Sequence, residues 1–292
     1  DHRDLHSFPT RRSSDLFWVW VFFFIGFGFK VPVVPFHTWL PEAHVEAPTV
    51  GSIILAGLLL KVGTFGMLRF MLPWLNYYTY RLQSLVFVLA LFSVFYASFI
   101  AIRQMDMKKV IAYSSVAHMA FVVMGLFSLT YFGLIGSYYT MLSHGIVASA
   151  LFFLVGTLYD RYGTRNLSYL GGLVVMMPVL AFLFFVFSLA NIGFPFTSNF
   201  IGELLIILGV MGKNLFVGIW SLFSIVLPPI YTMWLYNRIF YGRLSSKLVG
   251  FSDLNIMEFS LSAILLSLTI LLGVSPGTLT HYVEPFFVKL LF

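Results

Sequence analysis

Residues 30–70 read KVPVVPFHTWLPEAHVEAPTVGSIILAGLLLKVGTFGMLRF, and this stretch decides the fold. At Lys30 an apolar run stops, breaks at Pro32 and Pro35, and then restarts. Lys61 follows in the middle of an apolar segment that predicts an uninterrupted helix. A lysine at bilayer depth costs about 2.5–3.5 kcal/mol on insertion scales, so two of them indicate ion or proton handling.

The composition indicates an integral membrane protein. The chain is 60% hydrophobic and 10% charged, whereas soluble domains carry about 25% charged residues. Its apolar runs are about 20 residues long, and apolar and polar residues do not alternate within them, which favours helices over a β-barrel. The net charge is +6, but the basic residues lie between apolar runs and do not indicate nucleic-acid binding. The absence of cysteine excludes disulfides and thiolate-bound metal or iron–sulfur clusters.

Residues 1–15 differ from the rest of the chain. They are polar, have no apolar period, and include Asp1, Asp4 and Asp15, which argue against a mitochondrial transit peptide. The first methionine is Met67. We therefore interpret residues 1–15 as a non-native or disordered leader and residues 16–292 as one membrane domain.

The fold expected for that domain is an all-α, polytopic transmembrane helix bundle with about eight spans, two of them broken. The predicted spans are 17–47 (broken near Pro32–Pro35), 49–72, 83–102, 109–127, 131–159, 173–211 (broken near Gly193–Pro195), 213–240 and 257–279. Proline removes a backbone donor, and open backbone at membrane depth is tolerated only where protein or water covers it. Two interrupted spans also suggest an inverted-repeat transporter architecture.

The loops predict the orientation. Eight basic residues fall on one side of the expected bundle, against four on the other, which places the first group on the matrix or cytoplasmic side. The first group is Arg103, Lys108, Lys109, Arg161, Arg165, Arg238, Arg243 and Lys247; the second is Arg69, Arg81, Lys213 and Lys289.

The ionisable side chains inside the spans are few and share one depth. They are Lys30, Lys61, His118, His144 and Glu203. Because isolated charges facing lipid would be costly, we expect all five to face inward and to form a lateral proton relay through the bundle. Histidine suits a relay, since it changes charge near neutral pH.

Other side chains have expected roles around this row. Ser114 and Thr140 lie four residues before His118 and His144, so their hydroxyls are expected to assist them. His37, Glu42 and His44 lie in or after the first break and are expected to satisfy exposed backbone groups.

Each residue of the row also has a structural interpretation. The lysines could extend toward the membrane interface, the histidines could be hydrogen-bonded core residues or, less favoured, haem ligands, and Glu203 could pair with a helix end.

Residues 30–70 closely resemble the NADH dehydrogenase subunit 4 family, the antiporter-like membrane subunits of respiratory complex I. The similarity extends through RQMDMKKVIAYSSVAHM (103–119), the segment around His144, and NIGFPFTSNFIGE (191–203), and so covers most of residues 16–292. PFHxWLP is shared with subunits of multisubunit sodium/proton antiporters. The combination of AHVEAPT with LAGLLLK, and glutamate at position 203, resembles subunit 4 within that group.

The resemblance implies a proton-translocating function driven by quinone chemistry elsewhere in a complex. It assigns Lys30 to the input half of the path, Lys61 and His118 to its centre, His144 to a further link, and Glu203 to the exit. It implies that NADH, FMN, iron–sulfur clusters and ubiquinone are handled by other subunits, so this chain carries no cofactor. The implied partners are other complex I membrane-arm subunits, the lipid bilayer and protons, in the mitochondrial inner membrane or, less favoured, a bacterial inner membrane.

The family has about fourteen helices, so the chain resembles only its C-terminal part. The helices not represented here should supply a glutamate that pairs with Lys30. Truncation of the sequence and a subunit split into two polypeptides are both open, with truncation favoured. Two other functions also remain: a subunit of a sodium/proton antiporter, and a partial chain without catalytic activity.

Overall fold

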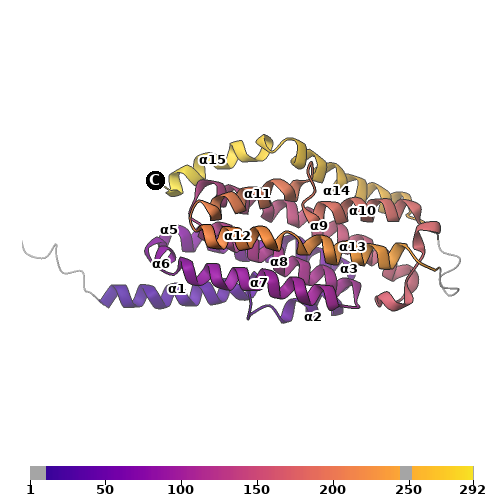
Figure 1. Ribbon diagram of the computed structural model, residues 1–292, viewed down its shortest axis with the longest axis horizontal. Helices are drawn as coiled ribbons and strands as arrows, with labels where there is room; N and C mark the ends of the chain where they lie inside the picture. The colour runs from indigo at the N-terminus through magenta and orange to yellow at the C-terminus, as the bar shows by residue number, and fades with distance from the viewer. Residues whose placement is uncertain (1–10, 244–251, 292) are drawn as a thin grey trace, which may run out of the picture.

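The computed structural model describes residues 11–243 and 252–291, whose regular structure is helical (Figure 1). The α-helices are α1 (Arg11–Lys30), α2 (Trp39–Glu46), α3 (Thr49–Ile54), α4 (Leu60–Gly66), α5 (Leu72–Trp74), α6 (Asn76–Arg81), α7 (Gln83–Arg103), α8 (Met107–Phe127), α9 (Tyr131–Tyr162), α10 (Pro178–Ile192), α11 (Ser198–Met211), α12 (Leu215–Ser224), α13 (Leu227–Phe240), α14 (Ile256–Val274) and α15 (Gly277–Leu291). Two π-helical turns, η1 (Leu55–Leu59) and η2 (Met67–Met71), and two 3-10 turns, η3 (Leu167–Tyr169) and η4 (Leu173–Val175), join them. The predicted all-α membrane bundle is confirmed.

Both predicted helix breaks are present. α1 ends at Lys30 and α2 begins at Trp39, and in the turn between them Val34 N donates to the Ser93 hydroxyl of α7 at 3.0 Å. The second break separates α10 from α11, where Gly193 adopts a left-handed conformation with φ 79°. At the first break, backbone opened at membrane depth is thus covered by protein, as a lipid environment requires.

The second span is not the uninterrupted helix that its apolar sequence predicts. Thr49–Trp74 forms one continuous helical rod, but η1 and η2 replace α-helical turns within it. At the end of η1 the N–H of Leu60 reaches the carbonyl of Leu55, five residues earlier. Apolar periodicity does not reveal such a turn, because a π-turn shifts the register by one residue without a proline or a polar break.

The last two predicted spans also differ from the structure. The span predicted at 213–240 is divided into α12 and α13, because Pro228 and Pro229 lie in the first turn of α13 and lack N–H groups. The span predicted at 257–279 ends at Val274, and Pro276 precedes a separate helix, α15, which the apolar pattern does not predict.

At the other end of the chain, α1 begins at Arg11, so residues 11–15 of the predicted leader are helical. The remainder of that leader, residues 1–10, lies outside the described residues.

Helix α8 runs through the centre of the bundle. Within the described ranges, six helical rods are long and apolar enough to cross a membrane, and α8 is the one that is almost completely buried. It packs between α7 and α9, and α11 lies along α9. The two halves of α8 belong to different apolar clusters, one shared with α1, α7 and α11 and the other shared with α10 and α13.

The basic loops gather at one end of the bundle, as the charge pattern predicts, although Lys247 of that group lies outside the described residues. Lys108 Nζ donates to the Ala47 carbonyl at 2.8 Å, and Arg165 donates to the Val45 carbonyl. Arg161 pairs with Glu258 across the same end at 2.6 Å. These contacts join the end of α2 to the start of α8 and to the loop after α9, and they join the end of α9 to the start of α14.

Candidate functional site

Four of the five predicted site residues form one chain across the centre of the bundle. Lys61 Nζ lies 2.8 Å from His144 Nδ1, and His118 Nδ1 lies 3.0 Å from Glu203 Oε1. The two imidazole rings between these pairs have centroids 5.4 Å apart. His118, His144 and Glu203 are buried, with at most 6% of each residue exposed. Four helical segments, α4, α9, α8 and α11, thus contribute one ionisable group each.

The π-turn η1 positions Lys61. It ends directly before α4, of which Lys61 is the second residue, and the Ala56 carbonyl within η1 accepts a 2.5 Å hydrogen bond from Lys61 Nζ. Gly57 faces α9, where a Cβ at Gly145 would lie 3.2 Å from the Gly57 carbonyl and 3.6 Å from Lys61 Cε. Close backbone approach between these glycines allows the ammonium group to reach His144.

The second helix break positions Glu203. Gly193 ends α10 in a left-handed conformation, and a Cβ there would lie 2.9 Å from Glu203 Oε2. Glycine adopts this conformation at no steric cost and lets the backbone come close to the carboxylate. Glu203 itself lies in the second turn of α11 and faces His118 of α8.

The two histidines do not hydrogen-bond each other. His144 Nδ1 faces the Lys61 ammonium, a donor, so its proton is assigned to Nε2. The Nε2 atoms of His144 and His118 are both buried, and neither has a hydrogen-bond partner among the described residues. The junction between the rings is therefore the one link of the chain without a direct polar contact.

Lys30 lies apart from this chain. It is the last residue of α1 and its side chain is exposed. Its Cβ lies against α4, where a Cβ at Gly63 would approach it to 2.9 Å. The role of Lys30 in the relay stays a prediction.

Several buried polar groups near the row were not anticipated. Asn199 lies one helical turn before Glu203, and the Tyr231 hydroxyl of α13 lies within electrostatic range of the Glu203 carboxylate. The Asn199 amide and the Tyr231 hydroxyl are buried without partners in the described part of the chain. The four-residue spacing could have revealed Asn199, whereas the proximity of Tyr231 depends on the packing of α13.

The expected assisting groups have other roles. Ser114 and Thr140 donate to carbonyls of their own helices, of Ile111 and Gly136, and not to the histidines. A hydroxyl in a helix readily bonds the carbonyl one turn earlier, and that local bond prevails here.

Of the three residues in or after the first break, His37 hydrogen-bonds the backbone of Pro35, whereas the side chains of Glu42 and His44 do not satisfy exposed backbone. Glu42 pairs with Lys109 at 2.7 Å. His44 is buried and stacks on Phe152 with centroids 4.3 Å apart, and neither of its ring nitrogens has a partner within the described ranges.

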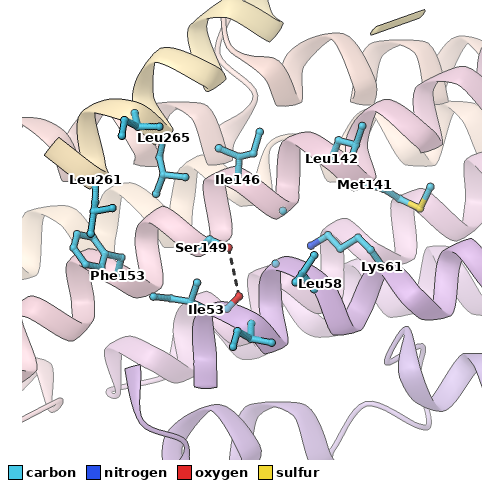
Figure 2. A pocket seen from close by; sticks show the side chains of 14 residues that line it. Ile53, Leu58, Lys61, Met141, Leu142, Ile146, Ser149, Phe153, Leu261 and Leu265 are labelled. Atoms are coloured by element: carbon cyan, nitrogen blue, oxygen red, sulfur yellow. Dashed lines mark hydrogen bonds between the residues drawn. The ribbon is translucent and has the colours of Figure 1, made fainter. Parts of the chain in front are cut away.

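An apolar cavity of about 570 Å³ adjoins the row (Figure 2). Side chains of α3, η1, α9 and α14 line it, and Figure 2 shows the Lys61 side chain pointing into it from the α4 side. The polar groups at its edge are few: Lys61, and the Ser149 hydroxyl, which donates to the Ile53 carbonyl at 3.4 Å. The low dielectric of this cavity strengthens electrostatic interactions of the ammonium group.

In residues 11–243 and 252–291 there is no group of three or more histidine, aspartate or glutamate side chains that could hold a metal ion. The row can carry out acid–base chemistry, because two histidines, a lysine and a carboxylate can each accept and release a proton.

Comparison with curated proteins gives relatives of high similarity. The chain is 50% identical over 276 residues to NADH-ubiquinone oxidoreductase chain 4 of Acanthamoeba castellanii, covering 94% of this chain and 56% of the relative. It is 44% identical over 264 residues to NADH-quinone oxidoreductase subunit M of Rhodobacter capsulatus, covering 90% of this chain and 52% of the relative. The chain thus spans about half the length of the curated relatives it matches.

Solved structures share the fold. A chain of respiratory complex I from Thermus thermophilus superposes with a TM-score of 0.89 at 31% identity, covering 95% of this chain and 59% of that one. A chain of the Mrp complex from Dietzia sp. superposes with a TM-score of 0.86, covering 94% of this chain and 59% of that one. Its identity is 18%, so the second similarity concerns the fold alone.

A family model described as "NADH:quinone oxidoreductase/Mrp antiporter, TM" matches residues 4–228. This match includes the whole Lys61–Glu203 chain and both helix breaks. The protein therefore belongs to the NADH:quinone oxidoreductase/Mrp antiporter transmembrane family.

Proposed function

We propose that this chain is part of a proton-translocating membrane-arm subunit of NADH:quinone oxidoreductase, respiratory complex I. The observation that carries the proposal is the buried sequence of contacts from Lys61 through His144 and His118 to Glu203. The similarity to chain 4 and subunit M relatives supports it, since those proteins are named as parts of this oxidoreductase.

In the proposed relay, a proton moves from the Lys61 ammonium to His144 Nδ1, which leaves a neutral amine and a protonated imidazole. His144 then releases its Nε2 proton toward His118, and His118 passes a proton from Nδ1 to Glu203 Oε1. The direct contacts of 2.8 Å and 3.0 Å suit the first and last transfers. The transfer between the rings needs a bridging water or a ring rotation, because their Nε2 atoms do not meet another polar group in the described structure.

Lys30 is proposed as the entry side of the path. It lies at the first helix break, and its Cβ packs against α4 at Gly63, two residues after Lys61. The positive charge of Lys30 would repel the positive charge of the Lys61 ammonium group. If Lys30 gained or lost an acidic partner, this repulsion would change, and so would the tendency of Lys61 to give up a proton.

The energy, in this proposal, comes from elsewhere in the complex. NADH, FMN, iron–sulfur clusters and ubiquinone would be handled by other subunits, and the partners of this chain would be other complex I membrane-arm subunits, lipid and protons. The membrane would be the mitochondrial inner membrane, and a bacterial inner membrane is the alternative, because relatives come from both kinds of source.

The test uses the complete subunit in its assembled complex. Lys61→Ala and Glu203→Gln are each expected to lower proton pumping and coupled electron transfer by roughly tenfold or more, since positioned proton-transfer groups contribute about 10²–10⁴. Pumping by reconstituted vesicles and NADH:quinone activity are the readouts. Lys213→Ala is the matched control, because Lys213 lies over the Tyr80 ring, away from the row.

Near-normal pumping by a fully assembled Lys61→Ala or Glu203→Gln complex would exclude the relay. Sodium-dependent proton exchange without NADH-oxidising subunits would instead favour an antiporter subunit, whose fold this chain shares. If neutralising the row changed assembly alone, the chain would be a scaffold.

A further inference from the structure

A polar pocket of about 470 Å³ lies at the basic end of the bundle, far along α13 from the relay. The last turns of α13 form one wall, and the segment around η3 forms the other. Its polar and aromatic lining consists of Ser168, Trp234, Asn237, Arg238, Tyr241 and Arg243. Figure 1 shows this end of α13 beside the loop that leads from α9 to α10.

The two arginines of this pocket lack partners among the described residues. At this end of the bundle, Arg161 pairs with Glu258 at 2.6 Å, and Lys109 pairs with Glu42 at 2.7 Å. For Arg238 and Arg243, by contrast, no hydrogen bond or ion pair of the side chain occurs with any residue that the structure describes. Two such guanidinium groups on one pocket favour a ligand with negative charge, and their planar donor sets match a phosphate.

The surroundings place the pocket at the membrane interface. Trp234 and Tyr241 line it, and these residue types are enriched at the level of lipid headgroups, where an apolar ring and a polar tip are both accommodated. The neighbouring loops carry the basic residues that mark the matrix or cytoplasmic side.

A stripe along α13 connects the pocket with the apolar part of the bilayer. Ile230, Trp234 and Arg238 recur every four residues along α13, so each lies beside the next on the helix surface, and Val226 directly precedes the first turn. Val226 and Ile230 are exposed, at 61% and 46%. The face is therefore apolar toward the middle of the membrane and ends in a guanidinium group at the interface.

We propose that this pocket binds an anionic phospholipid, with the phosphate held by Arg238 and Arg243 and an acyl chain lying along the Val226–Ile230 face. Asn237 and Ser168 would hydrogen-bond the polar part of the headgroup. Basic pockets between transmembrane helices on this side of a membrane are suited to such headgroups. The apolar stripe favours a lipid over a soluble phosphate, because a free phosphate would leave that face without a role.

The experiment uses the assembled complex that contains the complete subunit, in nanodiscs of phosphatidylcholine with a photoreactive phosphatidylglycerol. Labelled peptides are mapped by mass spectrometry. Labelling is expected within residues 226–243, at a level well above that given by a photoreactive phosphatidylcholine. Arg238→Gln and Arg243→Gln are each expected to lower it about fivefold, and Arg238→Lys is expected to retain much of it because the charge is kept.

Arg103→Gln serves as the control, since Arg103 is an exposed arginine at the same end of the bundle but outside the pocket. Equal labelling by the phosphatidylcholine probe would overturn the proposal. Loss of labelling in excess inorganic phosphate would assign the pocket to a soluble anion and overturn the lipid assignment. If the arginine variants do not assemble, competition in the unmodified complex decides: unlabelled phosphatidylglycerol should remove the label and phosphatidylcholine should not. None of these outcomes depends on proton pumping.

Discussion

The position of the Glu203 carboxylate depends on the backbone of one glycine. Gly193 lies in the left-handed region at the end of α10, and Glu203 Oε2 occupies the space that a side chain at Gly193 would need. The break in the sixth predicted span therefore places Gly193, which has no side chain, against the Glu203 carboxylate that faces His118. A proline-containing sequence such as NIGFPF predicts the break, but only the structure shows this contact.

Gly193→Ala is expected to lower proton pumping strongly, because the new Cβ would lie 2.9 Å from Glu203 Oε2 and displace the carboxylate from His118. The left-handed backbone adds a stability cost of about 1–2 kcal/mol. Pumping and thermal stability of the assembled complex are measured together.

Gly163→Ala provides the control for strain. Gly163 is also left-handed, with φ 64°, but a Cβ there would meet nothing within 4 Å. Equal losses of pumping in the two variants would mean that backbone strain, and not the displacement of Glu203, causes the effect.

At the scale of elements, the proposed relay depends on how closely η1 and α9 approach. A π-turn and two glycines, Gly57 and Gly145, bring the Lys61 ammonium to His144. π-turns within helices often mark functional positions, and here the turn also provides the Ala56 carbonyl as a second acceptor for the ammonium. The pairing of Lys61 with His144 is thus a property of two packed helices and not of either one.

Gly145→Val is expected to separate α9 from η1, because its Cβ would already lie 3.2 Å from the Gly57 carbonyl and the two methyl groups need more room. Overpacking of this kind costs typically about 1–3 kcal/mol. We expect a lower melting temperature and a large fall in proton pumping, since the contact between Lys61 and His144 would lengthen.

The matched variant is Gly277→Val in α15, which introduces the same β-branched side chain where nothing lies within 4 Å. It should leave pumping near the unmodified level. A Gly145→Val complex that pumps normally would show that the close approach of η1 and α9 is not needed.

At the scale of the whole molecule, the row lies between two apolar clusters. One cluster holds the second half of α8 with α1, α7 and α11, and the other holds its first half with α10 and α13. Loops rich in lysine and arginine close one end of the bundle. Polar groups at the centre are thus shielded by apolar packing on both sides, which limits the routes by which protons can reach them.

The orientation can be tested by labelling, since the sequence contains no cysteine. Tyr169 and Tyr77 are exposed residues at opposite ends of the bundle, at 65% and 67%. A membrane-impermeant thiol reagent is expected to reach Tyr169→Cys from the matrix or cytoplasmic side and Tyr77→Cys from the other side. The reverse pattern would show that the excess of basic residues does not set the orientation.

Much of the fold and of the site was predictable from sequence. Apolar runs of bilayer length determine most spans, and the prolines determine both breaks, because a missing N–H acts locally. The cost of a charge in lipid is also independent of tertiary detail, so all five residues of the row were expected to face inward. Lys61, His118, His144 and Glu203 do, whereas Lys30 is exposed. The π-turns could not be predicted, because no proline or polar residue marks them, whereas the division before α13 and the separate helix after Pro276 lie at prolines that the apolar pattern passes over.

The sequence by itself determined a membrane bundle of helices with a few ionisable groups at one depth, because hydropathy and proline act over short stretches of chain. Only the tertiary structure decided which of these groups meet. Lys61 pairs with His144, His118 pairs with Glu203, and Lys30 lies apart, because contacts between helices depend on packing between residues distant in sequence. The same packing left Arg238 and Arg243 together on one pocket, without a partner in the described part of the chain, which no linear pattern of charges could show.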